Sequence, residues 1–247
     1  MRFIFLFLIF SSYLIAQEEK NDTQLDNVIL FSINHSFQIP FGDLKKRFGN
    51  NSSISCVLSY KNKGIIYGLE AGFLFGSNVK ENNIFDNIDG NNGSIISQVG
   101  EIPTIRLFQR GGYIDFNLGK YVQLPSQKAR SGFNFSVGSG YIYHKIFIET
   151  LVTLLPQLND DLIKGYDRLC GGPHTKQVIE YIYFSKKNNI RYNVGVNFIQ
   201  AFTKDLRKYN YSEQSYVSNK RIDLLIGLKF GFIIPIKERT TEQYYYY

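Results

Sequence analysis

The chain has 247 residues, of which 44% are hydrophobic and 16% are aromatic, with 18 Tyr, 21 Phe and no Trp. This composition is too apolar for a disordered chain and is rich in residues that favour β-strands. The formal net charge is +7, but the sequence carries no recognised nucleic-acid-binding motif, and we expect no nucleic-acid partner.

The N-terminus has the pattern of a secretory signal. Arg2 precedes the apolar run 3–10, and the small residue Ala16 ends the segment. We therefore expect a signal peptide over 1–16, a short periplasmic segment over 17–27 and one β-barrel domain over 28–247. An N-terminal membrane anchor is disfavoured because polar residues follow Ala16 directly. After residue 16 no apolar run approaches 18 residues, which excludes a helical membrane protein.

Apolar residues alternate with small or polar ones in eight later segments, as they do in half-buried strands. The expected strands lie near residues 31–39, 54–60, 65–76, 114–119, 133–143, 177–186, 192–198 and 222–236. The phase of 177–186 is unclear because both faces are apolar. In the last segment, alternate positions from Ile222 to Ile236 are all apolar, and the other face contains Asp223, Gly227 and Lys229. Strands in soluble proteins rarely exceed about 10 residues, so this long alternation favours a strand that crosses a membrane.

Short and long connections alternate between these strands. The short ones lie near 61–64, 125–130 and 186–189, and the long ones near 41–52, 77–112, 147–176 and 203–219. Outer-membrane barrels have short periplasmic turns and long outer loops. The sequence therefore predicts an all-β fold, an eight-stranded antiparallel up-and-down transmembrane β-barrel with short periplasmic turns and four long extracellular loops. Tyrosines near both ends fit aromatic girdles: Tyr60, Tyr67, Tyr121 and Tyr192 near short turns, Tyr141 and Tyr143 near the opposite rim.

Three charged residues are predicted to face the axis of the barrel. These are Glu70, Asp115 and Lys229. Side chains fill the interior of an eight-stranded barrel, and buried charges there must pair. We expect a packed polar network in the lumen, which argues against solute conduction, although a narrow pore stays an alternative.

The chemistry of an enzyme at the outer rim would need a base beside a nucleophile or paired carboxylates. The alternation places His35 on the lipid side and His144 on the lumen side, and His174 is expected in a loop. Since no motif pairs His144 with a serine, a lipid-modifying enzyme is only an alternative. The sequence indicates no metal site or cofactor. Two free thiols are expected at Cys56 and Cys170, although one bridge between them stays open.

Two loop segments have the character of interaction motifs. Residues 41–49 contain Asp43 and Arg47, and residues 164–169 contain Lys164, Tyr166, Asp167 and Arg168. Together with the signal ending at residues 15–17, the eight strands and the aromatic C-terminus, these features resemble the small outer-membrane barrels of Bacteroidota, a loose class that includes PorT-like proteins. The resemblance implies export to the outer membrane and a non-enzymatic scaffold or accessory role in envelope assembly, secretion or transport. The implied partners are outer-membrane lipid, lipopolysaccharide and proteins of an envelope complex. The insertion signal is either the terminal run 244–247 or the apolar end of the last strand.

Overall fold

The computed structural model describes residues 28–81, 83–88, 95–98, 100–124, 131–151, 155–159, 161–184 and 191–237. Its long strands are β1 (Val28–Gly42), β2 (Asn51–Asn62), β3 (Ile65–Gly76), β4 (Ile105–Gln123), β5 (Gly132–Thr150), β6 (Cys170–Phe184), β7 (Arg191–Asp205) and β10 (Lys220–Lys237). The short elements are α2 (Leu44–Arg47), the 3-10 turns η2 (Pro156–Leu158) and η3 (Ile163–Gly165), and a hairpin of β8 (Tyr209–Asn210) and β9 (Ser215–Tyr216). No helix among the described residues is long and apolar enough to span a membrane. The predicted signal peptide, the segment 17–27 and the terminal tyrosines lie outside the described residues.

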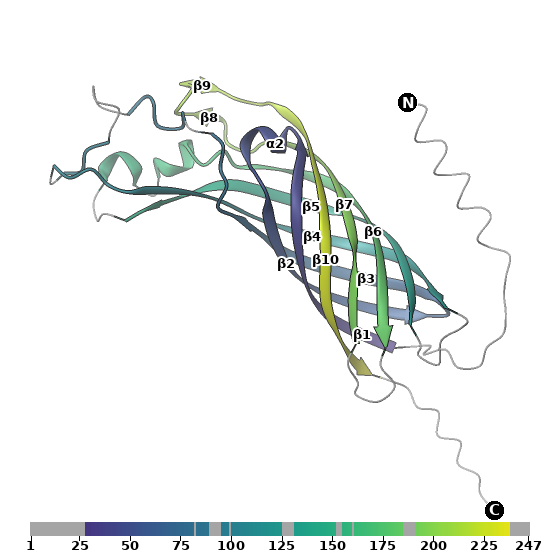
Figure 1. Cartoon of the computed structure of the whole chain (residues 1–247). Helices are drawn as coiled ribbons and strands as arrows, with labels where there is room; N and C mark the ends of the chain where they lie inside the picture. Colours follow the sequence, from purple (N-terminus) through teal and green to yellow (C-terminus); the bar gives the residue numbers. More distant parts are fainter. Residues whose placement is uncertain are drawn as a thin grey trace, which may run out of the picture.

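The long strands form one closed antiparallel barrel (Figure 1). Each strand pairs with its neighbours in the chain, and β10 pairs with β1 to close the ring. One row of paired residues starts at Ser32, passes Glu70, Asp115 and Asp223, and returns to β1 at Gly42, ten residues farther along. This stagger tilts the strands across the barrel axis and leaves an interior that side chains fill. The predicted eight-stranded up-and-down barrel is confirmed.

The predicted alternation of connection lengths holds with one exception. Short connections join β2 to β3, β4 to β5 and β6 to β7 at one end, which we call the turn end. The connections over 43–50, 77–104, 151–169 and 206–219 lie at the other end, which we call the loop end. The last three are longer than every connection at the turn end, but 43–50, with eight residues, is no longer than the β4–β5 connection over 124–131. The β2–β3 turn consists of Lys63 and Gly64, whose φ angles of 46° and 77° are those that a two-residue hairpin turn requires.

Some strands reach farther toward the loop end than the alternation predicted. β4 begins at Ile105, β5 continues to Thr150 and β6 begins at Cys170, so the loops before and between them are shorter than expected. Near this end the outward positions hold charged residues such as Arg110 and Lys145. The apolar alternation therefore stops before the strands do.

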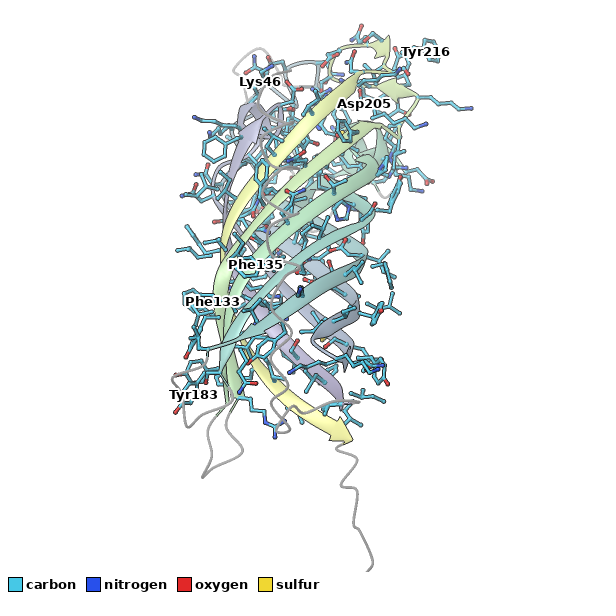
Figure 2. All side chains as sticks on the ribbon, turned by 90° about the vertical axis from the view of Figure 1, so that its right-hand side faces the viewer. Lys46, Phe133, Phe135, Tyr183, Asp205 and Tyr216 are labelled. Carbon is cyan, nitrogen blue, oxygen red and sulfur yellow. The ribbon has the colours of Figure 1, made fainter. Side chains whose placement is uncertain are left out.

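The outer surface of the wall is apolar. On β10, Ile222 and Phe232 are 53% and 69% exposed, whereas Asp223 and Lys229 face the axis and are 3% and 5% exposed. Figure 2 shows side chains projecting from the wall along its length, with Tyr183 at the turn end and Lys46 at the loop end. A closed barrel satisfies its backbone hydrogen bonds internally, and a predominantly apolar band on its outside matches the hydrocarbon layer of a bilayer. The chain is thus a membrane-spanning β-barrel.

The interior has apolar layers at both ends. Near the turn end, Val28, Leu30, Tyr121, Ile182 and Ile233 form a buried cluster. A larger buried cluster fills the loop end and includes Phe48, Leu74, Ile142, Ile146 and Ile199. Most of the buried charged side chains lie between these two clusters. The lumen is therefore closed by packed side chains on both sides of a polar middle layer.

One predicted girdle residue is misplaced. Tyr60, Tyr67 and Tyr192 are exposed on the wall as expected, but Tyr121 faces inward and is only 7% exposed. The Nζ atom of Lys61 lies 4.0 Å from the centre of its ring. Tyr121 is six residues from Asp115 on the same strand, and an even separation places both on the inner face.

Candidate functional site

The middle of the lumen holds a group of directly paired charges. Glu70 on β3 and Asp115 on β4 are register partners, and both side chains point inward. The Nζ atom of Lys176 on β6 lies 2.7 Å from Glu70 Oε2 and 2.7 Å from Asp115 Oδ2. His174 Nε2 lies 2.5 Å from the other carboxylate oxygen of Asp115. Facing like charges on neighbouring strands repel each other, and Lys176 reduces this repulsion by placing one positive charge between the two carboxylates.

Sequence reasoning missed Lys176 and placed His174 in a loop, which is wrong. Both belong to β6, whose inward row also contains Val178, Glu180 and Ile182. The sequence does contain the alternation of this strand, with a period of two that begins at His174. The alternation was missed because the outward positions of β6 include polar residues and proline instead of a continuous apolar row.

Lys229 pairs with Glu180, a residue that the sequence analysis did not include in the lumen network. Its Nζ atom lies 3.0 Å from Glu180 Oε2, and the Glu180 carboxylate also accepts hydrogen bonds from Asn134 (2.9 Å) and Asn193 (2.7 Å). The predicted residues Glu70, Asp115 and Lys229 are all buried in the lumen, but they belong to two ion-pair groups.

An internal cavity of about 50 Å³ joins the two groups. Glu70, Glu180 and Lys229 line it together with Asn117 and Asn193. A cavity of this size has room for a few water molecules beside its polar lining residues. Members of both groups therefore border the same cavity.

A third polar contact crosses the lumen closer to the loop end. His144 Nε2 on β5 lies 3.0 Å from Asp223 Oδ2 on β10, and Thr203 on β7 donates a 2.5 Å hydrogen bond to the same oxygen. The ring of Phe48 packs edge-on against His144 with centroids 5.7 Å apart. His144 thus faces the lumen near the rim, as predicted, and contacts an acid in a buried position. His35 is on the outer wall, as predicted.

The outer connections fold together over the loop end into a loop cap, which we define as α2 with residues 77–81, 83–88, 161–169 and 206–219. Its central residue is Glu81, whose carboxylate accepts a hydrogen bond from Arg47 Nε at 2.6 Å and another from Arg168 Nε at 3.0 Å. Arg47 also donates to the carbonyl oxygen of Arg168 at 3.1 Å, and Arg168 reaches Glu213 at 3.0 Å. The two motif arginines therefore tie four loop segments to one another.

The other motif residues of the third long loop are also part of the cap. Asp167 accepts two hydrogen bonds from Arg207, at 3.1 and 2.7 Å, and the hydrogen bond to Asp167 raises the pKa of Arg207. Tyr166 is buried, and its ring contacts Phe85 and Tyr211. These residues stabilise the loop arrangement from inside.

The remaining two motif residues lie on the outside of the loop end. Asp43 Oδ1 lies 2.8 Å from Lys46 Nζ, and its Oδ2 accepts from the backbone N–H of Ile222 at 3.0 Å. The hydrogen bond from Lys46, followed by that from Ile222, lowers the pKa of Asp43. Lys164 is paired with Asp161 at 2.8 Å on an exposed surface. That any of these six motif residues contacts another molecule stays a prediction.

Besides His35 on β1, the described part of the outer wall carries a group of polar side chains, which we call the wall patch. It consists of Ser139 on β5, Thr175 and Gln177 on β6, and Gln200 on β7. Ser139 is the register partner of Thr175, and Thr175 is that of Gln200. Gln200 Nε2 lies 3.5 Å from Gln177 Oε1. On β7 the patch is flanked by Phe198 and Phe202, so it lies within the apolar band.

Cys56 faces outward and Cys170 is buried, and both are free thiols. The Sγ atom of Cys170 accepts a hydrogen bond from the Arg47 guanidinium at 3.2 Å, which connects the start of β6 to the loop cap. Among the described residues, no group of three or more His, Cys, Asp or Glu side chains is arranged to hold a metal ion.

Comparisons with known proteins concern the fold. No protein-family model and no curated protein matches the sequence. Neisserial surface protein A has a similar structure, with 8% identity over 83% of this chain and 96% of that chain and a TM-score of 0.45. The attachment invasion locus protein Ail of Yersinia pestis is 8% identical over 85% of this chain and 99% of its own, with a TM-score of 0.39. A major outer membrane protein of Thermus thermophilus has 11% identity over 83% and 99%, with a TM-score of 0.37. At such identities the likeness extends to the fold alone.

Proposed function

We propose that this chain is a non-enzymatic integral outer-membrane barrel that acts as a scaffold or accessory subunit of an envelope assembly, secretion or transport complex. It is exported by its signal peptide and inserted with the turn end in the periplasm and the loop end outside. The PorT-like resemblance belongs to this proposal. Other proteins dock on its lipid-facing wall and on its extracellular loops.

The wall patch is the observation that carries the proposal. Its two glutamines have eight hydrogen-bonding positions between their side-chain amides, and a single 3.5 Å contact joins them. Polar side chains facing lipid tails lack hydrogen-bond partners, and in membrane proteins such side chains commonly bind across a protein interface. A second transmembrane polypeptide with hydrogen-bonding side chains would satisfy the patch.

The filled lumen supports a role other than transport through the barrel itself. Packed apolar clusters close both ends, and Lys176, which is 0% exposed, pairs across the middle. Opening a path for solutes would require both clusters and the ion pairs to separate.

The loops offer exposed apolar side chains for docking outside the membrane. Ile96, Ile102 and Leu151 are 55%, 70% and 54% exposed, and Tyr216 at the tip of β9 is 85% exposed (Figure 2). Interface cores are enriched in aromatic residues, which makes Tyr216 an anchor candidate.

Site-specific photocrosslinking in native membranes tests the proposal. A photoreactive residue replaces Gln177, and the matched control replaces Leu58, an exposed residue on β2 across the barrel. We expect a discrete protein adduct from position 177 and none from position 58. Lipid adducts alone at position 177, together with a single small species after mild detergent extraction, would count against a subunit role.

A further inference from the structure

Two pairs of cations face each other on the outer wall near the loop end. Arg110 on β4 is the register partner of Lys145 on β5, and Lys204 on β7 is that of Lys220 on β10. All four share the outward face, because they lie an even number of residues from wall residues such as Ile114, Tyr143, Phe202 and Ile222. Directly opposed residues on neighbouring strands have Cβ atoms about 5 Å apart, so each pair concentrates two positive charges.

Neither pair has a counterion in the part of the chain that the structure describes. No carboxylate among these residues forms an ion pair within 4.0 Å of any of the four side chains. Arg110 donates to the carbonyl oxygen of Gln109, a neutral group, at 3.2 Å. In the lumen, by contrast, the facing carboxylates of Glu70 and Asp115 share Lys176 as a cation. Facing like charges destabilise a strand pair, so an anion from outside the protein would relieve the repulsion on the wall.

The pair of Arg110 and Lys145 has a further feature that the other pair lacks. The guanidinium of Arg110 lies 5.1 Å from the ring centre of Phe108 and 5.7 Å from that of Phe147. These cation–π contacts hold the side chain against the wall. A guanidinium fixed in this way presents a planar fork of donors, which matches two oxygens of a phosphate group, and Lys145 adds a mobile point charge.

The position of this pair indicates the kind of molecule that carries the phosphate. Directly toward the turn end, the same face of the wall holds Ile114, which is 60% exposed, and the exposed rings of Tyr141 and Tyr143. A ligand bound here has its anionic group at the rim and an apolar surface immediately beneath. A phosphorylated lipid fits this arrangement, since its acyl chains lie along the apolar wall.

We propose that Arg110 and Lys145 form a binding site for a phosphate group of an outer-leaflet glycolipid, whose acyl chains pack on the wall below. The assignment to the outer leaflet rests on the orientation given under the proposed function. The phosphate site itself depends only on the wall geometry.

Binding of purified, refolded protein in a phosphate-free detergent tests the site. The probes are bisphosphorylated lipid A, the same lipid with its phosphates removed, and inorganic phosphate, with binding measured by native mass spectrometry. The variant Arg110→Gln/Lys145→Gln is compared with Lys204→Gln/Lys220→Gln, which removes the same charge from the same rim. A heat-modifiable gel shift verifies that each variant is folded.

We expect the first double variant to bind bisphosphorylated lipid A at least about tenfold more weakly, as the loss of charge-assisted hydrogen bonds implies. The affinity of the second double variant for this lipid should stay within about threefold of wild type, because Lys204 and Lys220 are not held by cation–π contacts as Arg110 is. The dephosphorylated lipid should bind wild type as weakly as the first variant binds the phosphorylated one.

Three results would overturn the proposal. Equal losses in both double variants would mean diffuse attraction to net charge, and unchanged binding in both would mean that the cations do not contact the lipid. Displacement of lipid A by inorganic phosphate at equal concentration would assign the site to free phosphate. Because the assay contains no protein partner, its outcome is separate from the crosslinking test of the subunit role.

Discussion

Lys176 is the side chain whose removal should most affect the stability of the barrel. It is completely buried and lies 2.7 Å from carboxylate oxygens of both Glu70 and Asp115. The substitution Lys176→Met keeps a long apolar side chain and removes only the charge. Both carboxylates then face each other across the β3–β4 pair without their shared cation.

The expected loss follows from the geometry of this group. Removing one partner of a buried ion pair destabilises a protein by about 3–5 kcal/mol, because the other charge stays buried without compensation. The hydrogen-bond donors of Glu70 that remain include the neutral groups of Tyr113, at 3.2 Å, and Asn117, at 3.3 Å. We therefore expect Lys176→Met to lower the free energy of unfolding by at least about 3 kcal/mol, which is more than a hundredfold in the equilibrium constant.

Urea unfolding of the barrel in lipid vesicles, followed by a heat-modifiable gel shift, measures this loss at pH 7. The triple variant Lys176→Met/Glu70→Gln/Asp115→Asn is the control, because replacing a complete buried ion group is often nearly neutral. The reasoning is wrong if Lys176→Met unfolds within about 1 kcal/mol of wild type, or if the triple variant is no more stable than the single one.

Three further predictions concern the cap, the inner face and the rim. Arg47→Gln should lower the stability of the loop cap by about 2 kcal/mol, because it removes the buried guanidinium that contacts Glu81 at 2.6 Å. Limited proteolysis should then cut the loop segments faster than in wild type, while the barrel strands stay protected. Gly140→Ala should destabilise the barrel by about 1–3 kcal/mol, because the added Cβ would collide with the backbone oxygen of Ile114. In the control Gly68→Ala, the added Cβ would lie 3.4 Å from Ser59, an ordinary contact. Its free energy of unfolding should stay within about 0.5 kcal/mol of wild type in the same urea assay. Asp43→Asn should reduce stability at pH 7, because the lowered pKa of Asp43 means that folding favours its ionised carboxylate. The difference in stability between variant and wild type should vanish once the pH falls below the folded-state pKa. A difference that persists at pH 2 would contradict the role given to Lys46.

The wall and the connections were predictable because they follow one rule. An antiparallel strand in a membrane barrel alternates with a period of two, and β10 keeps this period for its whole length, with Ile222 and Phe232 outside and Asp223 and Lys229 inside. The three longest connections lie at the same end because the chain crosses the membrane with each strand, although the first connection, over 43–50, is shorter than the sequence predicted. Neither feature depends on which residues meet across the interior.

The pairing inside the barrel could not be predicted from the same rule. Lys229 meets Glu180, and Lys176 meets Asp115, because the ten-residue stagger brings strands that are not neighbours to the same level. The period of each strand carries no information about this stagger. β6 was the weakest prediction because both faces of 177–186 contain apolar residues, and the polar outward residues Thr175 and Gln177 leave no continuous apolar row that would fix its phase.

The loop cap was recognised only as a group of unusual residues. The contacts of Arg47 with Glu81, and of Asp167 with Arg207, join segments that have no regular period. Sequence reasoning assigned such residues to external binding. The structure places Arg47, Tyr166, Asp167 and Arg168 in contacts within the cap, while Asp43 and Lys164 are at the surface.

The ion pair between Lys229 and Glu180 has a consequence for how the barrel is completed. Glu180 belongs to β6, whereas its cation arrives with β10, the final strand, whose pairing with β1 closes the ring. A chain inserted only as far as β7 would hold an uncompensated carboxylate at membrane depth, which is energetically unfavourable. Closure of the last seam thus brings Glu180 its cation, in the same step that pairs Asp223 of β10 with His144, and this stabilises the closed barrel relative to a chain inserted only as far as β7.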